Sequence, residues 1–320
     1  MKKVLIIGAG AIGRGFLAPL LHDLNFEISF LDKNIDLVKK LNKKKTYIAA
    51  ITNNKSYIFK KIVIKKAFNL KEKLNIKKYN LVFCCVGPKQ CEKIAVRLKD
   101  AKVIISCEND FFSVTKIKKK SRNKNVFFGI PDVITSSTAP KNLLKIDELT
   151  TVSEQGELIL EKGKYNISKK IKQVNRSELD QHWRAKLFIH NAPHAILAYL
   201  GHLKKYRYIH DAMMDENIKK IVIGSMKEVT NGVIKAKYVS KKFGTYYMNK
   251  EIKRFSNKLL FDPINRVARE PIRKLGKENR IILALRVAQW NNKQPKNIAI
   301  GVKAALKFNS KKDPESIYLQ

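Results

Sequence analysis

Short apolar blocks, separated by polar and helix-patterned stretches, run through the first 140 residues. The blocks predict strands at residues 4–7, 27–31, 57–64, 81–86, 103–107 and 126–130. An apolar-periodic helix is expected over residues 16–25, between the first two strands. Because strands that alternate with helices are typical of a parallel sheet, we expect the first half of the chain to form an α/β domain.

The pattern changes after residue 140. Residues 150–167 predict antiparallel strands, with Gly156 and Gly163 at the turns. From Ser177 to the C-terminus the pattern is mostly helical, which places a domain boundary near residue 176. At 320 residues the chain is long enough for two domains that each bury a sizeable core.

A glycine motif directly follows the first predicted strand, as Gly8-Ala-Gly10-Ala-Ile-Gly13. Gly8 allows a tight turn, Gly10 lets a pyrophosphate approach the backbone, and Gly13 lets the helix pack closely on the strand. The start of the helix then offers unpaired N–H groups to the phosphate charge. A glycine-rich turn without a ligand is the alternative, but the flanking strand and helix favour a Rossmann-type dinucleotide site.

Asp32 ends the second predicted strand and is expected to accept hydrogen bonds from ribose hydroxyls. Its charge would repel a 2′-phosphate, so NAD is favoured over NADP, although Lys33 softens that preference. The buried strand at residues 81–86 should also bring its carboxyl end to the cofactor. The predicted cofactor-binding residues are Gly8, Ala9, Gly10, Ala11, Ile12, Gly13, Arg14, Asp32, Val86 and Gly87.

A lysine, an asparagine and a histidine stand close together in the sequence Lys186-Leu-Phe-Ile-His190-Asn191-Ala-Pro-His194. A regular helix is predicted over residues 183–200 with Gly201 as its C-cap, and it would place Asn191 and His194 on one face. A lysine on such an apolar helix tends to be desolvated, which lowers its pKa and suits it to act as a general base. The alternative is a snorkelling lysine on an ordinary core helix.

Metal, redox and membrane signals are weak. His190 and His194 have the helical spacing of a metal-binding pair, but no carboxylate in the motif completes a site, so a metal-independent reaction is expected. The four cysteines lack zinc spacing and are expected as reduced thiols of a cytoplasmic protein. No apolar run is long enough to cross a membrane, and none resembles a signal peptide.

The chain carries 66 Lys and Arg residues against 27 Asp and Glu residues, a formal net charge of +39. Such a charge can indicate a nucleic acid or another polyanion as the partner. The lysines are spread along the whole chain, however, and accompany many Ile and Asn residues, as an AT-rich genome would produce. Specific nucleic-acid binding is therefore not expected, while the positive field would help to collect an anionic sugar phosphate.

Four segments carry a resemblance to a known family. They are residues 8–16, Ser106-Cys-Glu-Asn109, residues 186–201 and residues 266–275. Over nearly its whole length the chain resembles the polyol-specific long-chain dehydrogenases. Ala192-Pro193 replaces the Thr-Gly pair that is usual in that family, and Pro193 should kink or begin a helix at this point.

The resemblance implies an NAD-dependent, metal-independent oxidoreductase that interconverts D-mannitol 1-phosphate and D-fructose 6-phosphate. Lys186 would be the general base, and Asn191 and Asn109 would hydrogen-bond the developing alkoxide. His194 would position the substrate. Asp132 is similar to a family residue that orients a substrate hydroxyl.

A basic cluster is the candidate for the phosphate end of the substrate. Arg269 and Arg273 are expected to bind the phosphate and, with Arg266, would share one face of a helix. The alternative is a solvated face with Glu270 as a salt-bridge partner, and Pro271 could break the helix.

Two other functions stay open. One is a dehydrogenase of the same family that acts on an unphosphorylated polyol or a sugar acid, for which the arginine cluster would be dispensable. The other is a non-catalytic relic that binds nucleotides or polyanions and keeps the fold. The protein is expected to be a monomer or a homodimer.

Overall fold

The computed structural model describes residues 1–109, 111–137, 139–290 and 294–319. The chain divides into two compact units, Met1–Leu179 and Asp180–Gln320. The division lies inside helix α6 (Arg176–Arg184), so the predicted boundary at residue 176 falls at the first residue of that helix.

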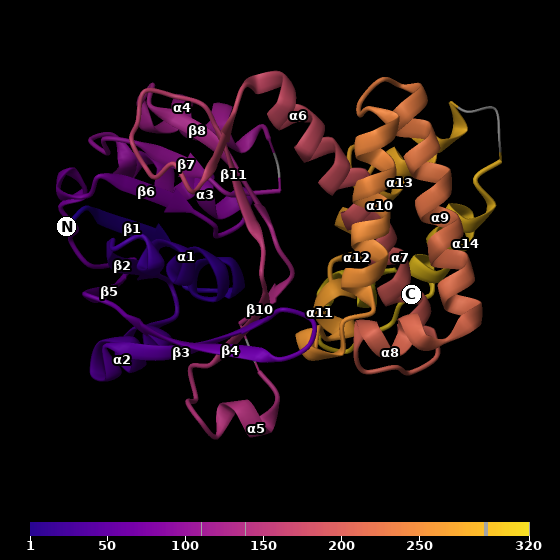
Figure 1. The fold of residues 1–320 in the computed structure, drawn as a ribbon, viewed down its shortest axis with the longest axis horizontal. Helices are drawn as coiled ribbons and strands as arrows, with labels where there is room; N and C mark the ends of the chain where they lie inside the picture. The colour runs from indigo at the N-terminus through magenta and orange to yellow at the C-terminus, as the bar shows by residue number, and fades with distance from the viewer. Residues whose placement is uncertain (110, 138, 291–293, 320) are drawn as a thin grey trace. The chain divides into compact units, whose positions relative to one another are not determined.

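The first unit is an α/β domain whose larger sheet has the strand order β12-β11-β8-β7-β6-β1-β2-β5 (Figure 1). From β8 to β5 every neighbouring pair is parallel, as predicted, whereas β11 is antiparallel to β8. The strands are β1 (Lys3–Ile7), β2 (Glu27–Asp32), β5 (Lys66–Asn69), β6 (Leu81–Cys84), β7 (Ile104–Ser106), β8 (Val126–Asp132), β11 (Glu157–Glu161) and β12 (Lys172–Val174).

A smaller sheet in the same unit has the order β4-β3-β10-β9. Its strands are β3 (Thr46–Thr52), β4 (Tyr57–Val63), β9 (Thr135–Ser136) and β10 (Thr151–Glu154). The predicted local antiparallel pairing over residues 150–167 is wrong, because β10 pairs in parallel with β3 and β11 pairs with β8 in the other sheet. Gly156 lies between them at a close approach, where a Cβ would be 2.5 Å from the Val133 Cβ.

Burial on both faces explains the unbroken apolar run of the first strand. Val4 to Ile7 are fully buried, because β1 lies between β2 and β6 at the centre of the sheet. The helices of this unit are the π-helix η1 (Gly13–Leu17), α1 (Ala18–Asp23), α2 (Ile35–Lys44), η2 (Ile76–Lys78), α3 (Pro88–Ala95), η3 (Val96–Leu98), α4 (Ser113–Ser121) and α5 (Lys141–Leu144).

In its described residues the second unit is helical. Its elements after α6 are the π-helix η4 (Ala185–Asn191), α7 (Ala192–Leu203), α8 (Ile209–Met214), α9 (Glu216–Lys235), α10 (Lys241–Phe255), η5 (Lys258–Leu260), α11 (Ile264–Ala268), α12 (Pro271–Lys274), α13 (Arg280–Gln289), α14 (Lys296–Leu306) and α15 (Pro314–Tyr318).

Helix α7 forms the centre of this second unit. It is buried on all sides from Ala192 to Gly201 and packs against α8, α9, α11 and α14, which explains why it is apolar all round. Gly201 does not cap the helix as predicted, because α7 continues to Leu203. A Cβ at Gly201 would lie 2.8 Å from the Ala212 Cβ, so glycine is needed here for the close approach of α8.

Candidate functional site

The glycine loop after β1 has the geometry of a phosphate-binding turn. Gly8 has a φ of +100°, which L side chains rarely adopt. A Cβ at Gly13 would lie 1.9 Å from the Gly8 carbonyl oxygen, so the helix can approach the loop only with glycine there. A Cβ at Gly10 would meet no described atom within 4 Å. The loop is therefore tight where it packs and open over Gly10, as a dinucleotide cradle requires.

The loop and Asp32 follow the neighbouring strands β1 and β2, at the carboxyl edge of the parallel sheet. Asp32 Oδ2 accepts a hydrogen bond from the Ala9 N–H at 2.7 Å, and Oδ1 accepts one from the Asn34 N–H at 2.8 Å. The carboxylate thus fixes the loop to β2. A carboxylate has about four acceptor positions, so Asp32 can accept ribose hydroxyls in addition.

Val86 and Gly87 follow β6 at the same edge. Gly87 has a φ of +93°, and its N–H donates to Glu108 Oε1 at 2.9 Å. The same carboxylate oxygen accepts the Cys91 thiol at 3.2 Å. The buried Glu108 therefore holds the turn after β6, a role that sequence reasoning missed although the residue stands beside Asn109.

The Arg14 side chain points into the interior of the first unit and away from solvent. Its side chain is buried and donates to the carbonyl oxygens of Ala9 at 2.7 Å, Leu149 at 2.6 Å and Ser137 at 3.2 Å. Burial lowers the pKa of this guanidinium below its ordinary value. These bonds correct the prediction that the Arg14 side chain contacts the cofactor pyrophosphate, because they give it a structural role beneath the loop.

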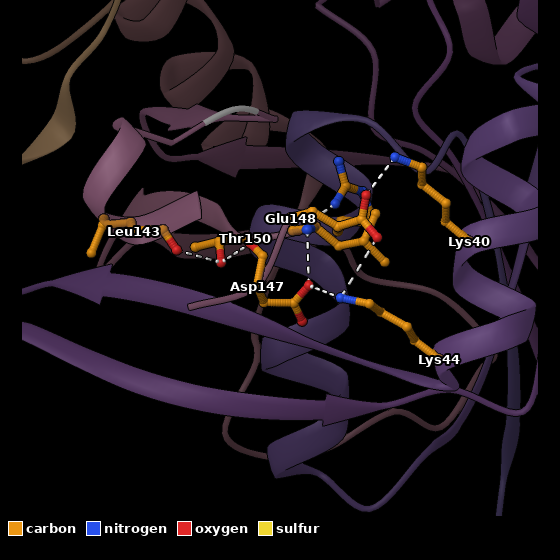
Figure 2. Close-up of polar contacts among 8 residues, drawn as sticks. Lys40, Lys44, Leu143, Asp147, Glu148 and Thr150 are labelled. Carbon is orange, nitrogen blue, oxygen red and sulfur yellow. Dashed lines mark hydrogen bonds and ion pairs between the residues drawn. The ribbon is translucent and has the colours of Figure 1, made fainter. Parts of the chain in front are cut away.

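The turn that carries Leu149 is itself held by ion pairs to α2 (Figure 2). Lys44 Nζ donates to Asp147 Oδ1 at 2.8 Å, and Lys40 Nζ donates to Glu148 Oε2 at 2.5 Å. The hydrogen bond to Asp147 raises the pKa of Lys44, and the one from Lys40 lowers the pKa of Glu148. These ion pairs therefore fix to helix α2 the turn whose Leu149 carbonyl accepts the hydrogen bond from Arg14.

The remaining predicted residues of the first unit lie along the same carboxyl edge. Asn109 is exposed after β7, and Asp132 is buried at the end of β8, the strand beside it. Ala11 accepts a hydrogen bond on its carbonyl from Thr135 Oγ1 at 3.2 Å. Ile12 is half-buried against the core.

The candidate catalytic helix differs from the regular helix predicted. Residues 185–191 form the π-helix η4, and α7 begins at Ala192 with Pro193 in its first turn, as Pro193 led us to expect. In a π-helix the backbone bonds join residues i and i+5, so Lys186 and Asn191 lie about one turn apart and closer to a common face. A regular helix would set them roughly 140° apart. Lys186 is half-buried and Asn191 is buried.

Two buried histidine–carboxylate–arginine chains lie behind this helix. His190 Nδ1 lies 2.5 Å from Glu251 Oε2, and the other oxygen of Glu251 accepts a hydrogen bond from Arg254. In the second chain, His194 Nε2 lies 3.1 Å from Asp262 Oδ2. Neither carboxylate had a local signal in the sequence, because each comes from a segment more than fifty residues away from its histidine.

The arginine cluster does not share one helical face as predicted. Helix α11 ends at Ala268, and Glu270 has a φ of +60° before Pro271 begins α12. Arg266 pairs with Asp262, and the exposed Arg273 pairs with Glu270 at 2.6 Å. The salt-bridged alternative is therefore present for Arg273, and the break at Pro271 is confirmed.

Lys274 is the chemically unusual member of this cluster. It is buried, and its ammonium donates to the Arg269 carbonyl. Burial, together with the nearby charges of Arg280 and Arg273, lowers its pKa to about 6. Burial and Arg273 also lower the pKa of Arg280 to about 10. Basic side chains thus collect around α12, and the carboxylates of Glu270, Asp313 and Glu315 lie against the same segment, where Asp313 accepts the Glu270 N–H and Glu315 accepts the Arg273 N–H.

The described residues contain neither a metal-binding cluster nor a membrane-spanning helix. Within those residues no group of three or more His, Cys, Asp or Glu side chains is placed to hold a metal ion. No helix among them is long and apolar enough to cross a membrane. The four cysteines, Cys84, Cys85, Cys91 and Cys107, are thiols rather than disulfides.

Two family models match the chain, and together they cover most of it. The mannitol dehydrogenase Rossmann domain matches residues 2–126, and the mannitol dehydrogenase C-terminal domain matches residues 178–320. The mannitol-1-phosphate 5-dehydrogenase of Caldanaerobacter subterraneus is 32% identical over 100% of this chain and 90% of its own length. The enzyme of that name from Clostridium acetobutylicum is 32% identical over 99% of this chain and 90% of its own length.

Solved structures agree at the level of the fold. The Pseudomonas fluorescens mannitol 2-dehydrogenase, in a ternary complex with NAD and D-mannitol, has a TM-score of 0.79 at 16% identity. That match covers 99% of this chain and 83% of the other. A substrate-free D-sorbitol dehydrogenase has a TM-score of 0.70 at 18% identity, over 95% of this chain and 79% of its own. The family models and the full-length relatives confirm the predictions of a Rossmann domain and of an oxidoreductase.

Proposed function

The chain belongs to the mannitol dehydrogenase family, and from that premise we propose that it interconverts D-mannitol 1-phosphate and D-fructose 6-phosphate with NAD. The observation that carries the proposal is the π-helix η4, which brings Lys186 and Asn191 closer to one face than a regular helix would and leads directly into the helix of His194. Full-length similarity to curated mannitol-1-phosphate 5-dehydrogenases supports the choice of substrate.

The first unit would hold the cofactor. The loop from Gly8 to Gly13 offers open backbone at Gly10, and Asp32 offers acceptors for the ribose. When bound, the nicotinamide accepts or donates the hydride. Glu108 keeps the turn at Gly87 in place, because its carboxylate accepts the Gly87 N–H.

Lys186 acts as the general base in this proposal. Lys186 is half-buried, and as a neutral amine it takes the proton from the reacting C–OH. In the reducing direction it returns that proton to the new alcohol. Asn191 donates to the oxygen that becomes negative, and the family resemblance gives Asn109 the same role. Asp132 orients a substrate hydroxyl on the same basis.

The phosphate is assigned to the positive region around α12. Arg269 and Arg273 supply planar donors, Arg280 adds positive charge, and Lys274 gains its charge when a bound phosphate raises its pKa. The ion pair between Arg273 and Glu270 favours the second candidate, a family member for an unphosphorylated polyol, because that arginine is already neutralised. Replacing Arg269 and Arg273 by Ala separates the two, since only the phosphate enzyme should lose affinity for its substrate.

Location and assembly follow as proposals. Four cysteines kept as thiols fit a reducing compartment, so we place the protein in the cytoplasm. The small-molecule partner is a polyol phosphate or a sugar phosphate, and the protein acts as a monomer or a homodimer.

The experiment that tests the base is a pair of lysine variants. Lys186→Met should lower turnover by about 10²–10⁴-fold, the usual range for loss of a general acid–base group, while NADH still binds. Lys219→Met is the matched control, because Lys219 is a half-exposed lysine of α9 that pairs with Glu216 on the same helix. Near-normal turnover of Lys186→Met would remove Lys186 from the role of base.

A further inference from the structure

His194 has a buried carboxylate behind it that comes from a different part of the chain. Its Nε2 lies 3.1 Å from Asp262 Oδ2, and the Phe255 ring stacks on the imidazole with centroids 4.8 Å apart and an angle of 12°. Both His194 and Asp262 are buried. In the described part of the chain neither of these two buried atoms has a hydrogen-bond partner, and the contact between them is the ion pair at 3.1 Å.

Arg266 holds the other side of the carboxylate. Its Nε and one terminal nitrogen approach Asp262 Oδ1 at 2.8 and 2.5 Å. The Asp262 carbonyl also accepts the Ile209 N–H at 2.9 Å, so the backbone of this residue is fixed as well. These bonds fix the orientation of the Asp262 carboxylate, so Oδ2 faces His194 before any ligand binds.

The charges of the pair decide where the hydrogen of the imidazole lies. Burial raises the pKa of Asp262, but Arg266 and His194 outweigh it and keep the pKa below its ordinary value. Burial lowers the pKa of His194, against the opposing effect of Asp262. At neutral pH this leaves a charged carboxylate facing a neutral imidazole. A carboxylate can only accept, so the ring nitrogen facing it must carry the hydrogen.

We propose that Asp262, held by Arg266, is a positioning residue that keeps His194 as the tautomer with its hydrogen on Nε2, so that Nδ1 accepts a hydrogen bond from a substrate hydroxyl. The inference rests on the proposed function, because contact between His194 and the substrate is part of it. It also gives Arg266 a task other than phosphate binding.

The tautomer can be read directly by ¹⁵N NMR of the full chain labelled at histidine. The signals of His194 are those lost in His194→Gln. We expect a protonated Nε2 and an unprotonated Nδ1 at pH 7.5, and a mixture of tautomers in Asp262→Ala. A hydrogen on Nδ1 in the wild-type protein, or an unchanged tautomer in Asp262→Ala, would overturn the proposal. This result does not depend on activity, so it stands apart from the proposed function.

Kinetics test whether Asp262 acts through His194. Asp262→Ala should lower kcat/KM for D-fructose 6-phosphate at least about tenfold, the effect of losing one charge-assisted hydrogen bond. Added to His194→Ala it should lower the rate no further, because residues that act as a unit are non-additive. Asp262→Asn keeps an acceptor of the same shape and should restore part of the activity. If the losses of kcat/KM in Asp262→Ala and His194→Ala add up in the double variant, Asp262 has a merely structural role.

A second aspartate provides the matched control. Asp211 Oδ1 also lies 3.1 Å from a histidine nitrogen, Nε2 of His210, but its side chain is 38% exposed. Asp211→Asn should leave kcat/KM within about twofold, since exposed pairs contribute little. A loss equal to that of Asp262→Asn would mean that general damage to this region, and not control of His194, lowers the rate.

Discussion

Replacing Gly10 by Ala separates cofactor binding from folding. A Cβ at Gly10 would meet no described atom within 4 Å, and the backbone there does not have a positive φ. The unfolded chain loses freedom when Gly becomes Ala, so the free energy of unfolding should stay equal or rise by about 0.4–1 kcal/mol. The new methyl group fills the space that the pyrophosphate needs.

The loss of affinity follows from the hydrogen bonds that the methyl group prevents. Displacing the pyrophosphate from the loop removes one or two charge-assisted N–H bonds, or about 2–4 kcal/mol of binding free energy. The Kd for NADH should therefore rise about 30- to 1000-fold. Gly13→Ala is the contrasting variant. Its Cβ would lie 1.9 Å from the Gly8 oxygen, so it should destabilise the fold by about 2–3 kcal/mol or more.

Urea unfolding and fluorescence titration with NADH measure the two quantities on the same samples. The reasoning predicts a stable Gly10→Ala protein that no longer binds NADH, and an unstable Gly13→Ala protein. Wild-type affinity in Gly10→Ala would refute it, because the open space would then lie away from the pyrophosphate. A large fall in the stability of Gly10→Ala would show that the loop is packed where the structure has it open.

Three further results are expected. Asp32→Ala should relax the preference for NAD over NADP in steady-state kinetics and weaken binding of both, since the carboxylate also holds the Ala9 N–H; an unchanged preference would argue against a ribose contact. Arg14→Met should lower the free energy of unfolding in urea by about 3 kcal/mol or more, because three carbonyls lose a charged donor; wild-type stability would contradict its structural role. Lys274 has a pKa of about 6 and is therefore mostly neutral at pH 8, and a bound phosphate dianion should raise that pKa. Binding of the sugar phosphate should therefore take up a proton, which calorimetry in two buffers detects. The affinity for the sugar phosphate should fall from pH 7.5 to 9. Binding without proton uptake would place the phosphate away from Lys274.

The cofactor half of the site could be predicted from local signals. The glycine spacing, the acid that ends the second strand and the apolar run of β6 are each contained in short segments, and the parallel sheet brings their ends together. Arg14 was misjudged because its partners, near residues 137 and 149, are distant in sequence. The sheet to which β10 belongs was missed for the same reason: its pairing with β3 joins residues about a hundred positions apart.

The substrate half was harder to predict, because its geometry departs from the regular helix. The residue types at positions 186, 191 and 194 indicated the chemistry, but periodicity could not distinguish a π-helix from an α-helix there. Pro271 gave a correct warning that the arginine helix would break. The carboxylates Glu251 and Asp262 carried no motif, and only the packing of α10 and α11 on η4 and α7 places them against His190 and His194.

The most direct test of the proposed function is NADH oxidation by the purified protein, followed by absorbance, with D-fructose 6-phosphate and D-fructose at equal concentrations. The account predicts rapid oxidation with the phosphate and little with the free sugar. Equal or faster oxidation with D-fructose would contradict the assignment of a phosphate substrate and move the protein to the free polyols. A folded protein that binds NADH and oxidises it with neither sugar would contradict the proposed reaction itself.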